Sequence, residues 1–275
     1  MNEYLQKKNA HPRDAYIHFD EGPHIYTIWK PKSPVCNRNM ESVHKGKKYT
    51  SVTTWIHKLF PTFNEDEIIK KMMGSPNWPK NKYHGKSVEE IKDLWESNRK
   101  EAAESGTKMH FNIECYYNHN EKEDYSTEYT YFMRFDEDRQ TYDPNLVPYR
   151  TEWMVYDEDM ELAGSVDMVY RDEKTGKLHI YDWKRCREIK KYNKWQCSIH
   201  PKIDHIPDTN FWHYSLQLNM YKRIIERKYG EEVGELWLVC LHPNQITYMK
   251  YKVPILNKEM DALICELEIN AKQVN

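Results

Sequence analysis

The chain has 275 residues, a net charge of −2 and six cysteines. Its length allows one large domain or two small ones, and 39% hydrophobic with 31% charged residues excludes wholesale disorder. No apolar run approaches the roughly 20 residues of a membrane span, and the polar N-terminus does not resemble a signal peptide. We therefore expect an intracellular protein without membrane contact, with reduced thiols because the cysteines are irregularly spaced.

The first half of the chain is predicted to be mainly helical. Alternating apolar residues predict a β-hairpin over 16–29, and a basic loop follows at 31–48. Helices are expected at 51–60, 64–73, from 87 onward and around His110, with a break near Ser105-Gly106, and at 129–138. Residues 74–86 and 118–128 are predicted to be loops.

The second half alternates strands and helices. Strands are expected at 149–157, 161–170, 177–184, 236–241 and 246–253, helices at 212–228 and 257–271, and an insertion at 185–210. The acids at 157–161 are typical of a solvated turn. The fold class is therefore α/β, with a central mixed β-sheet flanked by helices.

The central strands carry the residues with the clearest chemistry. Asp182 and Lys184 are two apart on a predicted strand, so their side chains leave the same face. A hairpin with the preceding strand would bring Asp167 beside them. Two close carboxylates repel each other unless a cation separates them, and oxygen ligands favour Mg²⁺ or Mn²⁺. An ordinary surface hairpin with an Asp–Lys pair is the alternative.

A series of motifs resembles the PD-(D/E)XK nuclease superfamily. The motifs are Glu152, Gly164-Ser-Val-Asp167 and Asp182-Trp-Lys184. Gly106-Thr-Lys-Met-His110 with Glu114, and Gln217-Leu-Asn-Met-Tyr221, resemble the RecB-like exonuclease branch. The opening stretch, including Thr50-Ser-Val-Thr-Thr54, is similar to the mitochondrial genome-maintenance exonuclease and to viral and phage relatives.

The resemblance implies a fold and an activity. It implies a restriction-endonuclease-like core with N-terminal helical additions, as a single nuclease domain over 1–275 with an N-terminal hairpin and helical part at 1–105 and a catalytic core at 106–260. It implies a metal-dependent DNA exonuclease acting on single strands or free ends, as in DNA repair or recombination, and a monomer is favoured. A structure-specific endonuclease or nickase, or a non-catalytic nucleic-acid-binding module, is the alternative. Composition and the insertion favour a large DNA virus or phage as the source.

The resemblance also assigns roles to residues. The implied ligands of one or two Mg²⁺ or Mn²⁺ ions are His110, Asp167, Asp182, the backbone carbonyl of Trp183 and, as a further candidate, Glu114. Glu152 would complete the metal shell or bind a second ion, and Lys184 would position the water and offset charge. Gln217 and Tyr221 would contact the phosphate or hold the site. No iron–sulfur cluster is expected, because Cys186, Cys197, Cys240 and Cys265 form no close trio.

Two segments are candidate DNA contacts. Ser51 and Thr53 begin a helix, where backbone N–H groups attract anions, although a plain N-cap also explains them. The segment 184–194 holds six basic residues and one acid. Basic side chains can follow a nucleic-acid backbone and aromatic rings can stack on bases, so we expect contacts from Arg185, Arg187, Lys190, Lys191 and Trp195. A solvated charged loop is the alternative.

Overall fold

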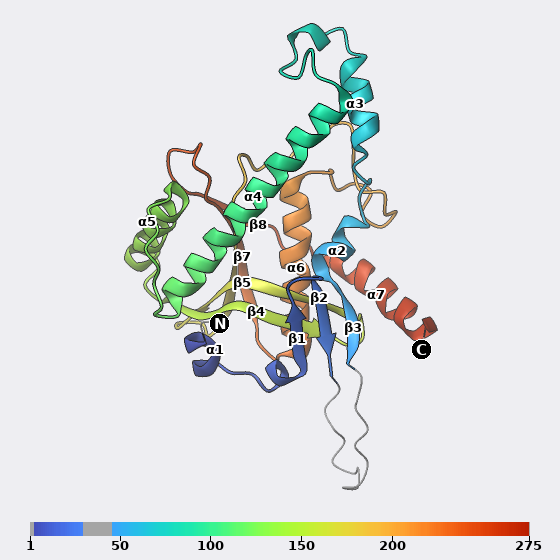
Figure 1. The fold of residues 1–275 in the computed structure, drawn as a ribbon. Coiled ribbons are helices and arrows are strands. Elements are labelled where there is room, and N and C mark those ends of the chain that lie inside the picture. The colour runs from blue at the N-terminus through green and yellow to red at the C-terminus, as the bar shows by residue number, and fades with distance from the viewer. Residues whose placement is uncertain (1–2, 30–45, 275) are drawn as a thin grey trace.

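The computed structural model describes residues 3–29 and 46–274 (Figure 1). In the first half, the elements are α1 (Tyr4–Lys8), η1 (Pro12–Tyr16), β1 (Ile17–Asp20), β2 (Ile25–Ile28), β3 (Lys47–Ser51), α2 (Val52–His57), α3 (Glu65–Met73), η2 (Trp78–Lys80), α4 (Val88–Tyr117) and α5 (Thr127–Tyr142). In the second half, they are β4 (Leu146–Asp157), β5 (Leu162–Asp172), β6 (Leu178–Lys184), α6 (Asn210–Lys228), β7 (Val233–Cys240), β8 (Met249–Val253) and α7 (Asn257–Val274).

The strands form one mixed eight-stranded sheet in the order β1-β2-β3-β5-β6-β7-β8, with β4 paired to β5. The β3–β5 and β6–β7 pairs are parallel, and the other neighbours are antiparallel. Helices cover both faces, so the predicted α/β class with a helix-flanked mixed sheet is confirmed.

Alternation along β6 divides its side chains between two hydrophobic cores. Ile180 belongs to the core on the side of α2, α6 and α7, whereas Tyr181 belongs to the core beneath α4 and α5. Both side chains are almost fully buried. The strand is therefore buried on both faces, and its charged residues Asp182 and Lys184 stand out against that apolar setting.

Strands β3 and β6 both pair with the same edge of β5, one at each end, and we call the opening between them the sheet fork. On one edge, the start of β5 pairs with β3 through Leu162 and Ala163, and its later part pairs with β6 from Met168 onward. Residues 164–167 fall between these two pairings. Along this edge, the described strand pairs therefore leave a gap at the Gly164–Asp167 segment.

Most predicted elements are confirmed, with three corrections. The hairpin of β1 and β2, the Ser51 and Asn64 caps, and strands β4 to β8 lie where the patterns indicate. The predicted break near Gly106 is wrong, because α4 continues through it and intrahelical hydrogen bonds offset the glycine's cost of about 1 kcal/mol. The predicted loop at 31–48 ends in strand β3, and its residues 31–45 lie outside the described ranges.

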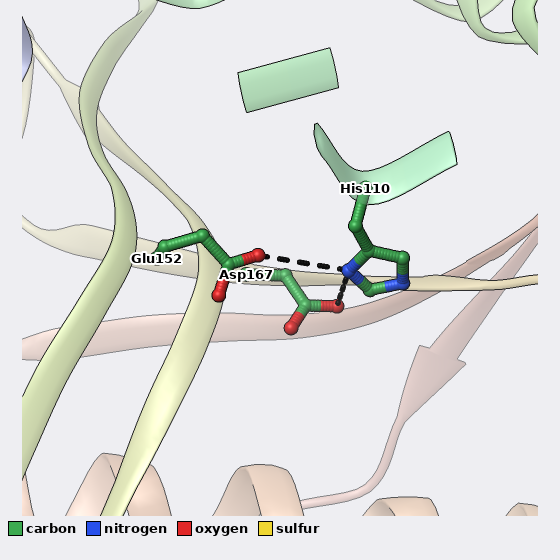
Figure 2. A group of neighbouring side chains, drawn as sticks. All are labelled: His110, Glu152 and Asp167. Atoms are coloured by element: carbon green, nitrogen blue, oxygen red, sulfur yellow. Dashed lines mark ion pairs between the residues drawn. The ribbon is translucent and has the colours of Figure 1, made fainter. Parts of the chain in front are cut away.

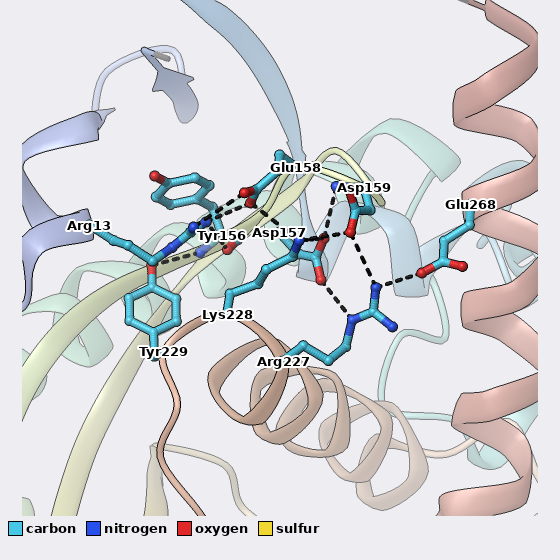
Figure 3. A network of polar contacts seen from close by, with 9 residues as sticks. All are labelled: Arg13, Tyr156, Asp157, Glu158, Asp159, Arg227, Lys228, Tyr229 and Glu268. Carbon is cyan, nitrogen blue, oxygen red and sulfur yellow. Dashed lines mark hydrogen bonds and ion pairs between the residues drawn. The ribbon is translucent and has the colours of Figure 1, made fainter. Parts of the chain in front are cut away.

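The solvated turn predicted for the acids at 157–161 is also partly wrong. Asp157 is fully buried and accepts a hydrogen bond from Arg227 Nε at 2.9 Å (Figure 3). Lys228 lies 3.6 Å from its other oxygen, which also accepts from Asp159 N. A buried carboxylate needs such partners, and this network anchors the C-terminal end of α6 to the β4–β5 turn.

Within the described ranges, no helix combines the length and the apolar character that crossing a bilayer requires. The longest helix, α4, instead carries charged residues along its N-terminal part. That part extends beyond the sheet and lies beside α3, to which Lys92 and Arg99 form ion pairs through Asp66 and Glu65 (Figure 1).

Candidate functional site

The fork in the sheet is shaped by Gly164 on β5 and Tyr221 on α6. A Cβ atom at Gly164 would lie 2.6 Å from Tyr221 Cε1 and 2.8 Å from its hydroxyl oxygen. Only glycine lets the tyrosine ring approach the strand this closely. The glycine of one predicted motif and the tyrosine of another are therefore complementary parts of one packing contact.

Three predicted residues converge beside this contact (Figure 2). His110 reaches down from α4, and its Nδ1 lies 3.6 Å from both Glu152 Oε1 and Asp167 Oδ2. One ligand atom from each of the three residues lies within 4.8 Å of the others. The opposite ring nitrogen of His110 lies 3.0 Å from the carbonyl oxygen of Trp183. The structure thus brings three of the predicted groups together, and it places the Trp183 carbonyl at the far nitrogen of the His110 ring.

The backbone at Glu152 turns its carboxylate toward this centre. Glu152 has a φ of +43°, in the left-handed region that a non-glycine residue rarely adopts inside a strand. Its Oε2 accepts a hydrogen bond from Ser165 Oγ at 2.8 Å. Strain of this kind typically costs 1–3 kcal/mol and gathers at functional sites, so it supports a role for Glu152 beyond the fold.

Asp167 occupies the gap in the strand pairing. Its Oδ2 accepts a hydrogen bond from the backbone N–H of Trp183 at 2.9 Å. The carboxylate thereby takes a backbone donor of β6 and is held beside Asp182 and Lys184. This confirms the expected proximity of the two segments.

Asp182 and Lys184 form a close ion pair on β6. Lys184 Nζ lies 2.5 Å from Asp182 Oδ2, and the ammonium also lies 4.7 Å from the centre of the Tyr214 ring. The Asp182 side chain is 3% exposed. The contact lacks hydrogen-bond geometry, so Oδ2 is a buried oxygen without a hydrogen-bond donor among the described residues.

The crowding of acids and cations shifts their pKa values. Burial lowers the pKa of His110, but Asp167 and Glu152 outweigh it and raise the pKa to about 9. Burial raises the pKa of Asp182 to about 7, with Asp167 adding to the effect and Lys184 opposing it. Burial also raises the pKa of Asp167. The protonated His110 ring therefore acts as the cation between two acids at neutral pH.

These residues fit a divalent cation. Two carboxylates and an imidazole converge, and a proton on His110 now offsets their negative charge. Carboxylate oxygens favour Mg²⁺ and Mn²⁺, and imidazole is compatible with Mn²⁺. The converging group contains neither Asp182 nor Glu114, so their roles as ligands stay predictions.

Gln217 links α6 to the start of α2. Its side-chain amide donates to Tyr221 Oη at 3.0 Å and to Thr53 Oγ1 at 3.1 Å. Ser51 Oγ caps α2 by accepting from Thr54 N at 3.0 Å. The N-cap explanation for Ser51 is thus confirmed, and Thr53 is tied to the site through Gln217.

The predicted DNA contacts in the segment after β6 differ in whether their side chains are already paired within the protein. Arg185 donates to Glu128 at 2.6 Å, so its guanidinium is already paired. Arg187, Lys190 and Lys191 are exposed, and the Trp195 ring is 81% exposed. A ring so exposed is open to stacking, whereas Arg185 would first have to leave Glu128.

Sequence reasoning missed several residues that shape the site. Tyr214 lies on the same face of α6 as Gln217 and Tyr221, at spacings of three and seven, so helical periodicity could have found it. Ser165 lies inside the predicted Gly164–Asp167 motif. Glu128 gives no signal, because its partner Arg185 is 57 positions away.

Comparisons with known proteins do not identify a family for this chain. No family model and no curated protein matches the chain. A solved structure described as the crystal structure of SSO0001 is 15% identical with a TM-score of 0.27, and the match covers 54% of this chain and 59% of that one. A similarity this low indicates neither a shared fold nor a shared activity.

Proposed function

We propose that the protein is a metal-dependent DNA exonuclease of the RecB-like branch of the PD-(D/E)XK superfamily. The observation that carries the proposal is the convergence of His110, Glu152 and Asp167 at the sheet fork, next to the Asp182–Lys184 pair. The sequence motifs that resemble this family meet there in space, although His110 and Trp183 are 73 positions apart along the chain.

Each residue has a defined task in this proposal. His110, Glu152 and Asp167, with Asp182 and the Trp183 carbonyl beside them, would hold Mg²⁺ or Mn²⁺. The bound ion would supply Lewis acidity and ease deprotonation of the attacking water. Lys184 would hold that water or the scissile phosphate and offset the charge that develops on it. Gln217 would steady Tyr221 and Thr53 along the path of the phosphate backbone.

Metal binding would require His110 to lose its proton. The raised pKa of about 9 keeps the ring protonated at neutral pH, and a coordinating imidazole must be neutral. Asp167 and Glu152 would then hold a divalent cation whose charge would take the place of that proton. Binding should therefore release protons and strengthen as the pH rises toward 9.

The exposed basic and aromatic residues after β6 would form the path for the DNA strand. Trp195 and Tyr192 present rings that can stack on unpaired bases, and Lys194 lies 4.6 Å from the Trp195 ring centre. Stacking of this kind requires splayed bases, which favours single-stranded DNA or frayed ends over an intact duplex.

The deciding experiment uses end-labelled linear and circular single-stranded DNA with Mn²⁺ or Mg²⁺. The proposal expects mononucleotides or short products from the linear strand and none from the circle. Cutting of the circle would favour an endonuclease. If neither substrate is degraded, although DNA is still bound, the chain is a non-catalytic binding module.

A further inference from the structure

Two cysteine sulfurs lie in contact just beyond Lys184. Cys186 Sγ and Cys240 Sγ are 3.3 Å apart, although the residues are 54 positions apart in sequence. Cys240 Sγ also donates to the Cys186 carbonyl at 2.8 Å, and Gln245 Nε2 donates to Cys240 Sγ at 3.2 Å. These contacts orient the two thiols toward each other.

The fold holds the pair in place from both sides. Cys240 ends β7 and is the register partner of Lys184 across the parallel β6–β7 pairing. Leu241 N donates to the Lys184 carbonyl at 2.8 Å. Cys240 is fully buried, whereas Cys186 is partly exposed, so a small oxidant reaches the pair from the Cys186 side.

We propose that Cys186 and Cys240 are an oxidisable thiol pair, and that their disulfide is a modification that displaces Lys184. A disulfide has an S–S length of about 2.05 Å, so the sulfurs must approach by roughly 1.3 Å. Cys240 lies inside the sheet whereas Cys186 lies beyond the end of β6, so the shift falls on the residues that follow Lys184 and pulls on that lysine through the chain. A displacement near 1 Å at a reacting group can cost roughly 100-fold in rate.

Hydrogen peroxide is the oxidant in this scheme. A thiolate of the pair attacks one peroxide oxygen, the O–O bond breaks and hydroxide leaves, giving a sulfenic acid. The second sulfur attacks that sulfur, the S–O bond breaks, and the remaining thiol proton leaves with the hydroxyl as water. Overall, two thiols lose two electrons and two protons, and peroxide is reduced to two waters.

The electrostatics of the pair support this chemistry. Hydrogen bonding from Cys186 lowers the pKa of Cys240 to about 6, and the same contact raises the pKa of Cys186. When Cys240 loses its proton, it gives up its hydrogen bond to the Cys186 carbonyl and accepts the S–H of Cys186 instead, and the resulting thiolate is the form that reacts with peroxide. Cys197 and Cys265 are exposed thiols for which the structure gives no such contact, so they are natural controls.

The experiment titrates the reduced full chain with hydrogen peroxide and maps the products by peptide mass spectrometry without reduction. We expect a peptide pair joined through Cys186 and Cys240, formed at lower peroxide than any modification of Cys197 or Cys265. The C197S/C265S double variant should form the same bond, and C186S should not. Oxidation of Cys197 and Cys265 while Cys186 and Cys240 stay reduced would overturn the proposal.

The effect on Lys184 rests on the proposed nuclease function and is measured separately. Cleavage of single-stranded DNA should fall at least about tenfold on oxidation, recover with dithiothreitol and stay unchanged in C186S under the same treatment. Full activity of the disulfide form would refute the displacement of Lys184. If the reduced protein cleaves no DNA at all, only the nuclease proposal is refuted, because the disulfide is detected separately by mass spectrometry.

Discussion

Replacement of Gly164 by alanine tests how the sheet fork is built. The new methyl carbon would lie 2.6 Å from Tyr221 Cε1, whereas carbon atoms normally approach to about 3.5–4.0 Å. The Tyr221 side chain is buried and its hydroxyl accepts from Gln217, so the ring has little room to retreat. Overpacking of this kind typically costs 1–3 kcal/mol. Urea unfolding of G164A should show a loss of that size.

Two further variants make this prediction sharp. G106A places a methyl group where no atom lies within 4 Å, inside the continuous helix α4, so it should stabilise by up to about 1 kcal/mol. In a Y221A background, G164A should cost much less than in the wild type, because the clashing ring is gone. Unaltered stability of G164A, or additive costs in the double variant within about 0.5 kcal/mol, would refute the contact.

The remaining predictions address pH, buried charge and DNA affinity. The ordinary pKa of histidine is 6.5 and that of folded His110 is about 9, so its stabilisation is complete below pH 6.5 and is lost as the pH rises through 9. In EDTA, the free energy of unfolding of the wild type should fall by on the order of 3 kcal/mol across that window. The free energy of unfolding of H110Q should fall clearly less. D157N should lower the unfolding free energy by roughly 3 kcal/mol because Arg227 and Lys228 lose their buried partner, whereas D159N, on an exposed side chain, should change it by less than about 1 kcal/mol. Equal effects of the two would exclude a special role for Asp157. In salt titrations of single-stranded DNA binding, R187A/K190A should reduce the salt slope by about 1–2, while W195A should weaken binding by about 1–3 kcal/mol with little change of slope. If R187A/K190A binds DNA with the same salt slope as the wild type, the DNA does not contact these two residues.

Much of the fold was predictable because its elements carry strong local signals. Strands β4 to β6 read as apolar segments separated by turns, and Ser51 and Asn64 mark helix starts with side chains that cap them. The helix break at Gly106 was wrong because a single glycine costs only about 1 kcal/mol, which a long helix can absorb. Asp157 was misread because its partners on α6 lie 70 positions away.

The candidate site was predictable as a set of residues but not as a geometry. Spacing on one strand gives the Asp182–Lys184 pair, and motif order gives His110, Glu152 and Asp167. The left-handed backbone of Glu152 and the contact of Cys186 with Cys240 leave no trace in local patterns. They arise where segments distant in sequence meet at the fork.

In the proposed function, Lys184 acts beside a metal centre to cleave DNA. The most direct measurement is Mn²⁺-dependent degradation of end-labelled single-stranded DNA by the wild type and by K184A, with DNA binding and folding measured on both proteins. We predict degradation by the wild type, a loss of at least about 100-fold in K184A, and similar binding by the two. Equal degradation by K184A and the wild type would contradict the account.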